Sequence, residues 1–135
     1  MIELPFEKVT TDRFGLIYEP TIPVAIEGPR GSADVFMIID SGADISLIPF
    51  SVGEYIGLDL DITQRRDVRG IGESSVAYIL SDVRLRIGDI VLTARIAWSL
   101  TDDVPLILGR LDVFRELVIE FREFEDKIVI ERAGA

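Results

Sequence analysis

The amino-acid sequence predicts a mainly β fold for this 135-residue chain. Glycine and proline recur at short intervals, 11 and 6 times respectively, which is typical of a chain of short strands joined by turns. The segments between them are rich in β-branched and aromatic residues. Only two short segments carry apolar residues at helical spacing. The length suits one hydrophobic core and is too short for two ordinary lobes, so we expect residues 1–135 to form a single domain.

Composition and charge exclude several classes of partner. The formal net charge is −10, which repels the phosphates of nucleic acids and anionic lipids, so we expect neither nucleic acid nor membrane as a partner. No apolar run approaches the roughly 20 residues that a membrane helix requires. The first residues include acidic side chains and Pro5, where a secretion signal would have a basic start and a continuous apolar segment. These features predict a cytoplasmic protein.

The chain contains neither cysteine nor histidine. This absence excludes thiolate nucleophiles, Ser-His triads, disulfides and zinc sites built from thiolates or imidazoles. Carboxylates are the main acid-base groups that remain near neutral pH. The sequence lacks the Asp-x-Asp-x-Asp-Gly pattern of a calcium loop, so we expect no metal and no cofactor.

The first predicted hairpin leads to an acidic residue. Ile22–Ile26 and Ala33–Ile39 are β-rich runs on either side of a four-residue turn at 28–31. The second run continues directly into Asp40. An aspartate at the end of an apolar strand is costly to desolvate unless hydrogen bonds or a shared proton compensate, so Asp40 is a candidate functional residue.

The middle of the chain is predicted to hold one helix and further hairpins. Pro49–Ile56 favours a short helix that ends at Gly57, although Gly53 weakens it. A glycine-rich tip at Gly70–Ser75 and a two-residue turn at Gly88–Asp89 join the strands that follow. Those strands are expected at Arg65–Arg69, Val76–Leu80, Val83–Ile87 and Ile90–Trp98.

The C-terminal third begins with Leu106–Leu108, a short apolar run that ends at Gly109. The next segment, Arg110–Leu117, has apolar residues at helical spacing and predicts a helix of about two turns. Val118–Phe124 and Lys127–Glu131 alternate apolar and polar residues, so they predict a last hairpin.

Three separated segments, in this order, resemble the retropepsin-like aspartic proteases. The first is DSGAD at 40–44, at the end of an apolar strand. The second is the glycine-tipped hairpin about Ile71, placed where that family has its flap. The third is LILGR at 106–110. Asp-Ser-Gly alone would be a weak signal, but the apolar flanks, the order and the spacing make the set specific. The resemblance extends from about Ile22 to Leu117.

This resemblance implies a closed, barrel-like acid protease fold with a flap hairpin and one or two short helices. It also implies a homodimer to which each subunit contributes one Asp40. Two carboxyls about 3 Å apart cannot both ionise and therefore share a proton, an effect for which aspartic proteases are themselves the standard example. One carboxylate then takes a proton from water while the other carboxyl polarises the peptide carbonyl, and the two titrate as a pair.

The same resemblance assigns roles to the neighbours of Asp40. Ser41 is expected to hydrogen-bond across the dimer axis, and Gly42 to donate its N–H to the carboxylate. Asp44 and Arg110 are expected to form an ion pair under the active site. The flap would close over an extended peptide. Expected substrate-binding residues are Ala43, Asp44, Ile45, Leu47, Gly70, Ile71, Gly72, Val104, Pro105 and Ile107, and their apolar character predicts cleavage between hydrophobic residues.

The predicted function is thus an aspartic endopeptidase that hydrolyses extended peptides as a homodimer. Two alternatives remain: a catalytically inactive dimerisation or peptide-binding module with the same fold, and a monomeric β-barrel in which the pair of acids never forms. By themselves, residues 40–42 could be a plain turn after a strand. Asp102–Asp103 is interpreted as a solvated loop and Trp98 as core or dimer filling. The hairpin at 118–131 forms either within one subunit or between two.

Overall fold

The computed structural model describes residues 1–69 and 75–134, and the fold is mainly β, as predicted. One α-helix, α1 (Phe50–Tyr55), and two short 3₁₀ helices, η1 (Ile62–Gln64) and η2 (Glu123–Glu125), accompany the strands. The strands are β1 (Ile2–Leu4), β2 (Glu7–Thr11), β3 (Gly15–Glu19), β4 (Thr21–Gly28), β5 (Gly31–Ile39), β6 (Ser46–Ile48), β7 (Arg65–Arg69), β8 (Ser75–Ile87), β9 (Ile90–Ser99), β10 (Ile107–Leu108), β11 (Leu117–Arg122) and β12 (Lys127–Arg132).

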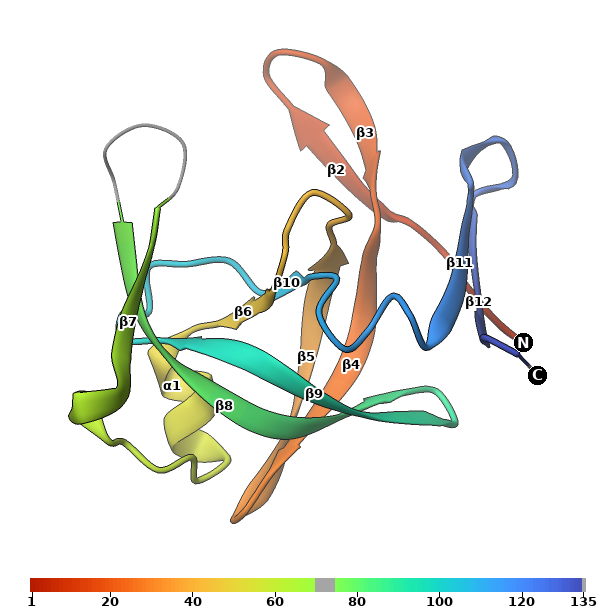
Figure 1. The fold of residues 1–135 in the computed structure, drawn as a ribbon. Helices are drawn as coiled ribbons and strands as arrows, with labels where there is room; N and C mark the ends of the chain where they lie inside the picture. Colours follow the sequence, from red (N-terminus) through yellow and green to blue (C-terminus); the bar gives the residue numbers. More distant parts are fainter. Residues whose placement is uncertain (70–74, 135) are drawn as a thin grey trace.

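Six strands close into a barrel, which confirms the predicted fold class. The sheet runs in the order β4-β5-β10-β6-β9-β8-β7, and β4 also pairs with β8. This second pairing, at Ala25↔Arg86 to Glu27↔Arg84, joins the two ends of the six-stranded part. Figure 1 shows the strands wrapped around one another, with β7 extending beyond the closure. Closure leaves the barrel strands with few free edges.

Alternating side chains of the barrel strands fill its interior. In β4, Ile22, Val24 and Ile26 are buried while the residues between them are more exposed. The same alternation occurs in β8, where Leu85 and Ile87 have no exposed surface. A period of two is the expected pattern for strands with one buried face. This packing fixes the register in which β5 delivers its last residue to the rim of the barrel.

The predicted helix is present and packs against Trp98. Trp98 is 1% exposed, stacks on Phe50 with ring centroids 5.3 Å apart, and donates a hydrogen bond from its Nε1 to the Phe50 carbonyl oxygen at 2.9 Å. A Cβ on Gly53 would lie 2.1 Å from the Trp98 Nε1. Gly53 therefore weakens the helix intrinsically but permits the contact that holds it. Trp98 belongs to the core of the single chain.

Asp102 and Asp103 are exposed and lie in a loop, as predicted, but Asp102 also has a structural role. Asp102 is exposed, but its Oδ1 accepts a 2.7 Å hydrogen bond from the backbone N–H of Ser51 in the first turn of α1. That backbone hydrogen bond lowers the pKa of Asp102 below its ordinary value. The N-terminal N–H groups of a helix need such acceptors. A residue far away in the sequence supplies one here.

The helix predicted at Arg110–Leu117 is absent. Residues 111–116 form successive turns, with hydrogen bonds from the N–H of Val113 and of Phe114 to the carbonyl oxygen of Arg110. Asp112 has a φ of 62°, which a right-handed helix cannot contain. The apolar spacing was real, but the left-handed residue breaks the helix near its start.

The remaining hairpins lie where the sequence predicts them, with two differences. The runs expected at 76–80 and 83–87 form the single strand β8, which pairs with β9 from Tyr78↔Ser99 to Ile87↔Ile90. Sequence reasoning also missed β1, β2, β3 and β6. The N-terminal strands are short and partly polar, and β6 has three residues, so neither gives a clear periodic signal.

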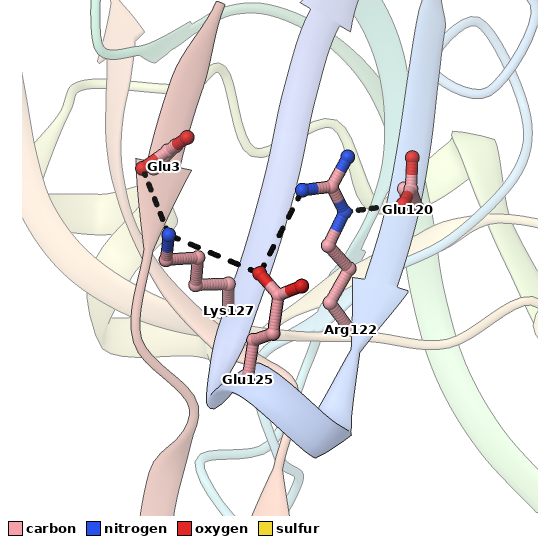
Figure 2. Close-up of polar contacts among 5 residues, drawn as sticks. All are labelled: Glu3, Glu120, Arg122, Glu125 and Lys127. Carbon is pink, nitrogen blue, oxygen red and sulfur yellow. Dashed lines mark hydrogen bonds and ion pairs between the residues drawn. The ribbon is translucent and has the colours of Figure 1, made fainter.

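The C-terminal hairpin forms within one chain, as part of the three-stranded sheet β1-β12-β11. Ile128 and Ile130 are fully buried on one face of this sheet. The other face carries a charged network that links all three strands (Figure 2). In this network Lys127 Nζ lies 3.7 Å from a Glu3 carboxylate oxygen and 3.9 Å from one of Glu125, and Arg122 pairs with Glu120 and Glu125. The buried face therefore packs on the body while the charged face is solvated.

The two N-terminal strands β2 and β3 form a separate two-stranded sheet, hereafter the arm. It projects from the barrel in Figure 1. At its base, Lys8 Nζ lies 3.5 Å from a carboxylate oxygen of Asp126 in the turn before β12. No helix within the described ranges 1–69 and 75–134 is long and apolar enough to cross a membrane.

Candidate active site

The candidate site begins where β5 leaves the barrel. Ile39, its last residue, is buried, and Asp40 follows it in a half-buried position. The Asp40 N–H donates a 3.0 Å hydrogen bond to the carbonyl oxygen of Leu108 in β10. The parallel pairing of β5 with β10 is thereby extended by one residue. The apolar strand thus carries the acid to the barrel rim and a second strand fixes its backbone.

The loop after β5 wraps around the Asp40 carboxylate. The N–H of Gly42 donates to Asp40 Oδ1 at 2.9 Å, and the N–H of Ala43 donates to the Asp40 carbonyl oxygen at 3.2 Å. A Cβ on Gly42 would lie 3.2 Å from that carboxylate oxygen, a tight contact. Ser41 and Gly42 are both exposed. The loop therefore orients the carboxylate by a backbone donor and presents its outer residues to the surface.

Gly109 locks the loop to β10. Its N–H donates a 2.9 Å hydrogen bond to Oγ of Ser46, whose side chain is fully buried. A Cβ on Gly109 would lie 2.4 Å from the carbonyl carbon of Ile45, so only glycine fits without moving backbone. Sequence reasoning assigned no role to Ser46. A polar residue between apolar ones at the start of a buried strand was the available signal.

Backbone hydrogen bonds continue this lock beyond Gly109. The N–H groups of Arg110 and Leu111 donate to the carbonyl oxygens of Ala43 and Asp44 at 3.0 and 2.8 Å. The side chains of Asp44 and Arg110 form an ion pair. In the single chain this pair lies at the surface, with the two side chains 87% and 53% exposed. The two motifs thus meet mainly through their backbones.

A second carboxylate, Asp112, anchors the far end of the locking segment. Its oxygens accept hydrogen bonds from Arg95 in β9, at 2.9 Å from the backbone N, 2.8 Å from Nε and 3.0 Å from Nη2. The side-chain hydrogen bond from Arg95, followed by the backbone one, lowers the pKa of Asp112 to about 2. Asp112 has a φ of 62°, a conformation that aspartate tolerates better than most residues.

Asp112 thereby ties the segment that holds the Asp40 loop to a barrel strand. Arg95 is next to Ile96, where the pairing of β9 with β6 begins. The Asp112 carboxylate thus accepts the hydrogen bond of the Arg95 backbone N–H, just outside the segment of β9 that pairs with β6. Nothing in the sequence pattern distinguishes Asp112 from other surface acids, so sequence reasoning did not find it.

The predicted substrate-binding residues are only partly brought together. Leu47 in β6 lies opposite Ile107 in β10, and Ile45 contacts Gly109. Ala43, Ile45, Leu47, Val104 and Ile107 are half-buried, whereas Pro105 is exposed. The predicted residues Gly70, Ile71 and Gly72 lie outside the described residues. The strands that lead to them, β7 and β8, pair with each other up to Arg69↔Ser75.

The arrangement supplies one oriented carboxylate per chain. Asp40 alone can act as a base or, when protonated, as an acid, but peptide hydrolysis without a metal needs both at once. Within residues 1–69 and 75–134, no group of three or more carboxylates lies close enough together to hold a metal ion. The chemistry of this site therefore depends on what faces the exposed loop.

Comparison with known proteins adds two kinds of finding. A family model described as "Aspartyl protease" matches residues 22–110, the span that contains both the loop and β10. A search of curated proteins finds no match.

Among solved structures, the chain is similar to EIAV protease complexed with the inhibitor HBY-793, at 21% identity and a TM-score of 0.51, over 76% of this chain and 88% of that one. It is also similar to a retropepsin-like aspartic protease from Rickettsia conorii, at 15% identity and a TM-score of 0.56, over 95% and 89% of the two chains. At these identities the likeness supports the fold.

Proposed function

The chain belongs to the aspartyl protease family, and on that basis we propose that it is an aspartic endopeptidase active as a homodimer. The observation that carries the proposal is the Asp40 loop. Its carboxylate is oriented by Gly42, and its backbone is tied to β10 while Ser41 and Gly42 remain exposed. A loop built in this way holds one acid firmly and offers it to a partner.

A second copy of the chain would complete the chemistry. A two-fold axis beside the loop brings the Asp40 carboxyls of both subunits together, and two such groups at close range hold one proton between them. Ser41 is exposed, and in this dimer its hydroxyl would hydrogen-bond to the partner loop. Each subunit thus contributes half of an acid-base pair that neither has alone.

The reaction then follows from the two protonation states. The ionised carboxylate removes a proton from a water molecule, and the resulting nucleophile attacks the peptide carbonyl carbon. The protonated carboxyl donates its hydrogen bond to the carbonyl oxygen and stabilises the tetrahedral intermediate. When the intermediate collapses, a proton passes to the leaving amine and the C–N bond breaks. One carboxyl ends protonated, as at the start.

An extended peptide is the substrate that suits the surroundings of Asp40. The half-buried side chains near the loop, Ala43, Ile45, Leu47, Val104 and Ile107, are all apolar. Apolar side chains of a substrate would lose water on contact with them, which favours cleavage between hydrophobic residues. β7, which lies at the end of the strand order beyond the barrel closure, has an edge with backbone groups of the kind that pair with extended peptides.

The test is cleavage of a mixed peptide library at acidic to neutral pH, with and without a pepstatin-type inhibitor. Asp40→Asn should lower the rate at least about a hundredfold, because general acid-base catalysis contributes that much or more. Asp59→Asn, an equally conservative change at an exposed aspartate in the segment after α1, is the matched control and should leave the rate unchanged.

Two outcomes would overturn the proposal. A folded dimer of the natural chain that cleaves no peptide would indicate a binding module instead. Undiminished specific activity after dilution below the dimer dissociation constant would show that one subunit suffices, against the shared-acid mechanism.

A further inference from the structure

The arm forms a sheet of its own and has little contact with the rest of the described chain. β2 and β3 pair with each other from Glu7↔Glu19 to Thr11↔Gly15. No residue from 7 to 19 is buried, and none belongs to the hydrophobic core. A two-stranded hairpin alone in water is at best marginally stable. The single chain therefore leaves the arm without a packing partner.

The arm nevertheless presents apolar side chains to solvent. Phe14 at its turn is 73% exposed, and Leu16 and Tyr18 in β3 are 53% and 40% exposed. Leu16 and Tyr18 share one face of the hairpin, together with their cross-strand partners Thr10 and Lys8. Clustered exposed apolar residues of this kind mark interaction surfaces.

The position of the arm indicates which partner covers it. Figure 1 shows the arm and the loop that follows β5 on the same side of the barrel. This is the side from which a second Asp40 would have to approach, so this step rests on the proposed function. A second copy also carries a net charge of −10 and is repelled by acidic surfaces. Within β2 and β3, the Leu16–Tyr18 face has Lys8 as its one charged residue, and Lys8 is paired with Asp126 of its own chain, so this face is close to neutral and repels an acidic partner little.

A surface complementary to the arm exists on the same chain. A groove of about 480 Å³ lies at the base of the arm, lined by Leu4, Pro5, Phe6, Pro23 and Phe36 among others. Phe36 at this groove is 66% exposed. Strands of five residues extend roughly 17 Å, enough to carry the turn of the arm well away from its own base. A two-fold dimer that sets one arm on the other subunit's groove also sets the second arm on the first groove, so the two contacts are identical.

We propose that the arms are exchanged in the dimer, so that Phe14 and Leu16 of each subunit pack on the partner subunit's groove around Phe36. The exchange buries apolar surface that the single chain leaves in water and holds the two Asp40 loops together. It makes the arm an assembly element that acts on catalysis only through dimerisation.

Sedimentation velocity on charge variants tests the energetic part. Leu16→Glu should weaken the dimer at least tenfold and lower activity at low protein concentration, with activity recovered at high concentration. Tyr55→Glu, at a residue of α1 that is 72% exposed, is the matched control and should leave dimerisation unchanged. Because Leu16 lies outside the core, the unfolding midpoint of a dilute sample should not fall.

Cross-linking tests the geometry. Because the natural chain has no cysteine, the introduced cysteines are the only ones that can form a disulfide. A mixture of Phe14→Cys and Phe36→Cys proteins should form a disulfide-linked heterodimer under mild oxidation, at a yield far above that of a Phe14→Cys and Tyr55→Cys mixture.

The possible failures are distinguishable. A dimer with Asp40-dependent cleavage that is insensitive to Leu16→Glu, or gives equal yields in the two mixtures, overturns the arm exchange alone. A chain that stays monomeric at all concentrations overturns the dimeric enzyme and the exchange together.

Discussion

The Asp40 loop and the arm differ in how the rest of the chain holds them. The loop is tied by backbone and side-chain hydrogen bonds to β10, and its lock at Gly109 leaves no space for even one added carbon atom. The arm bonds mainly to itself, and a Cβ at its Gly15 would meet nothing within 4 Å. The difference teaches that close packing is concentrated around the Asp40 loop, while exposed apolar surface is concentrated on the arm, where we propose that a second subunit binds.

The largest expected difference in stability between the two regions comes from a glycine-to-alanine substitution in each. Gly109→Ala forces a Cβ into the Ile45 backbone and should cost about 3 kcal/mol or more of unfolding free energy, at the upper end for overpacking, and abolish peptide cleavage. In Gly15→Ala the added Cβ meets no other atom, so the loss of unfolding free energy comes only from placing alanine at a φ of +67° and should be about 1 kcal/mol. This variant should keep its activity. Chemical denaturation measures both. Equal losses for the two variants would break the comparison.

A smaller difference in unfolding free energy is expected between two variants that each remove a hydroxyl group. Ser46→Ala removes the acceptor of the buried Gly109 N–H and should cost about 1–3 kcal/mol of unfolding free energy. Thr11→Ala removes an acceptor for the Phe14 N–H in the exposed arm, where water can replace it, so its cost should stay under about 1 kcal/mol. Urea titration of the two variants measures the difference. A Thr11 effect as large as that of Ser46 would contradict the view of the arm as solvated.

The smallest predicted effect is a pH dependence carried by Asp112. Because Arg95 holds the folded pKa at about 2, below the ordinary 3.8, this carboxylate stabilises the fold above pH 3.8, and that contribution is lost as the pH falls toward 2. Asp112→Asn should flatten this part of the stability curve, measured by thermal unfolding between pH 5 and pH 2. Asp59→Asn is the control. If the stability of Asp112→Asn falls between pH 5 and pH 2 as steeply as that of the natural chain, the contact with Arg95 does not stabilise the segment at 111–116.

Much of the architecture could be predicted from sequence because most strands bury one face. The runs that became β4, β5, β7, β9, β11 and β12 carry period-two patterns or strong turn residues at their ends. Those features depend on local composition, which a sequence displays. That DSGAD and LILGR meet was expected only through the resemblance to the retropepsin-like aspartic proteases, because local composition does not indicate which strands lie together.

The parts that could not be predicted depend on tertiary contacts. The left-handed Asp112 breaks an otherwise plausible helix for the sake of its hydrogen bonds with Arg95. Asp102 caps a helix from 51 residues away, and Ser46 serves a backbone N–H that lies 63 residues on. The arm was missed for a different reason: neither face of its strands is fully buried, and both faces mix polar and apolar residues, so hydrophobic periodicity gives little signal there.

The two-residue strand β10 has a consequence for the biogenesis of the molecule. It lies between β5 and β6 and accepts the hydrogen bond of the Asp40 N–H, yet it is made only at residues 107–108. During synthesis the chain emerges N-terminal part first, so the acid loop leaves the ribosome long before the strand that anchors it. A nascent chain therefore exposes the Asp40 loop before the strand that fixes the Asp40 backbone has been made, so the loop can reach its final conformation only late in synthesis.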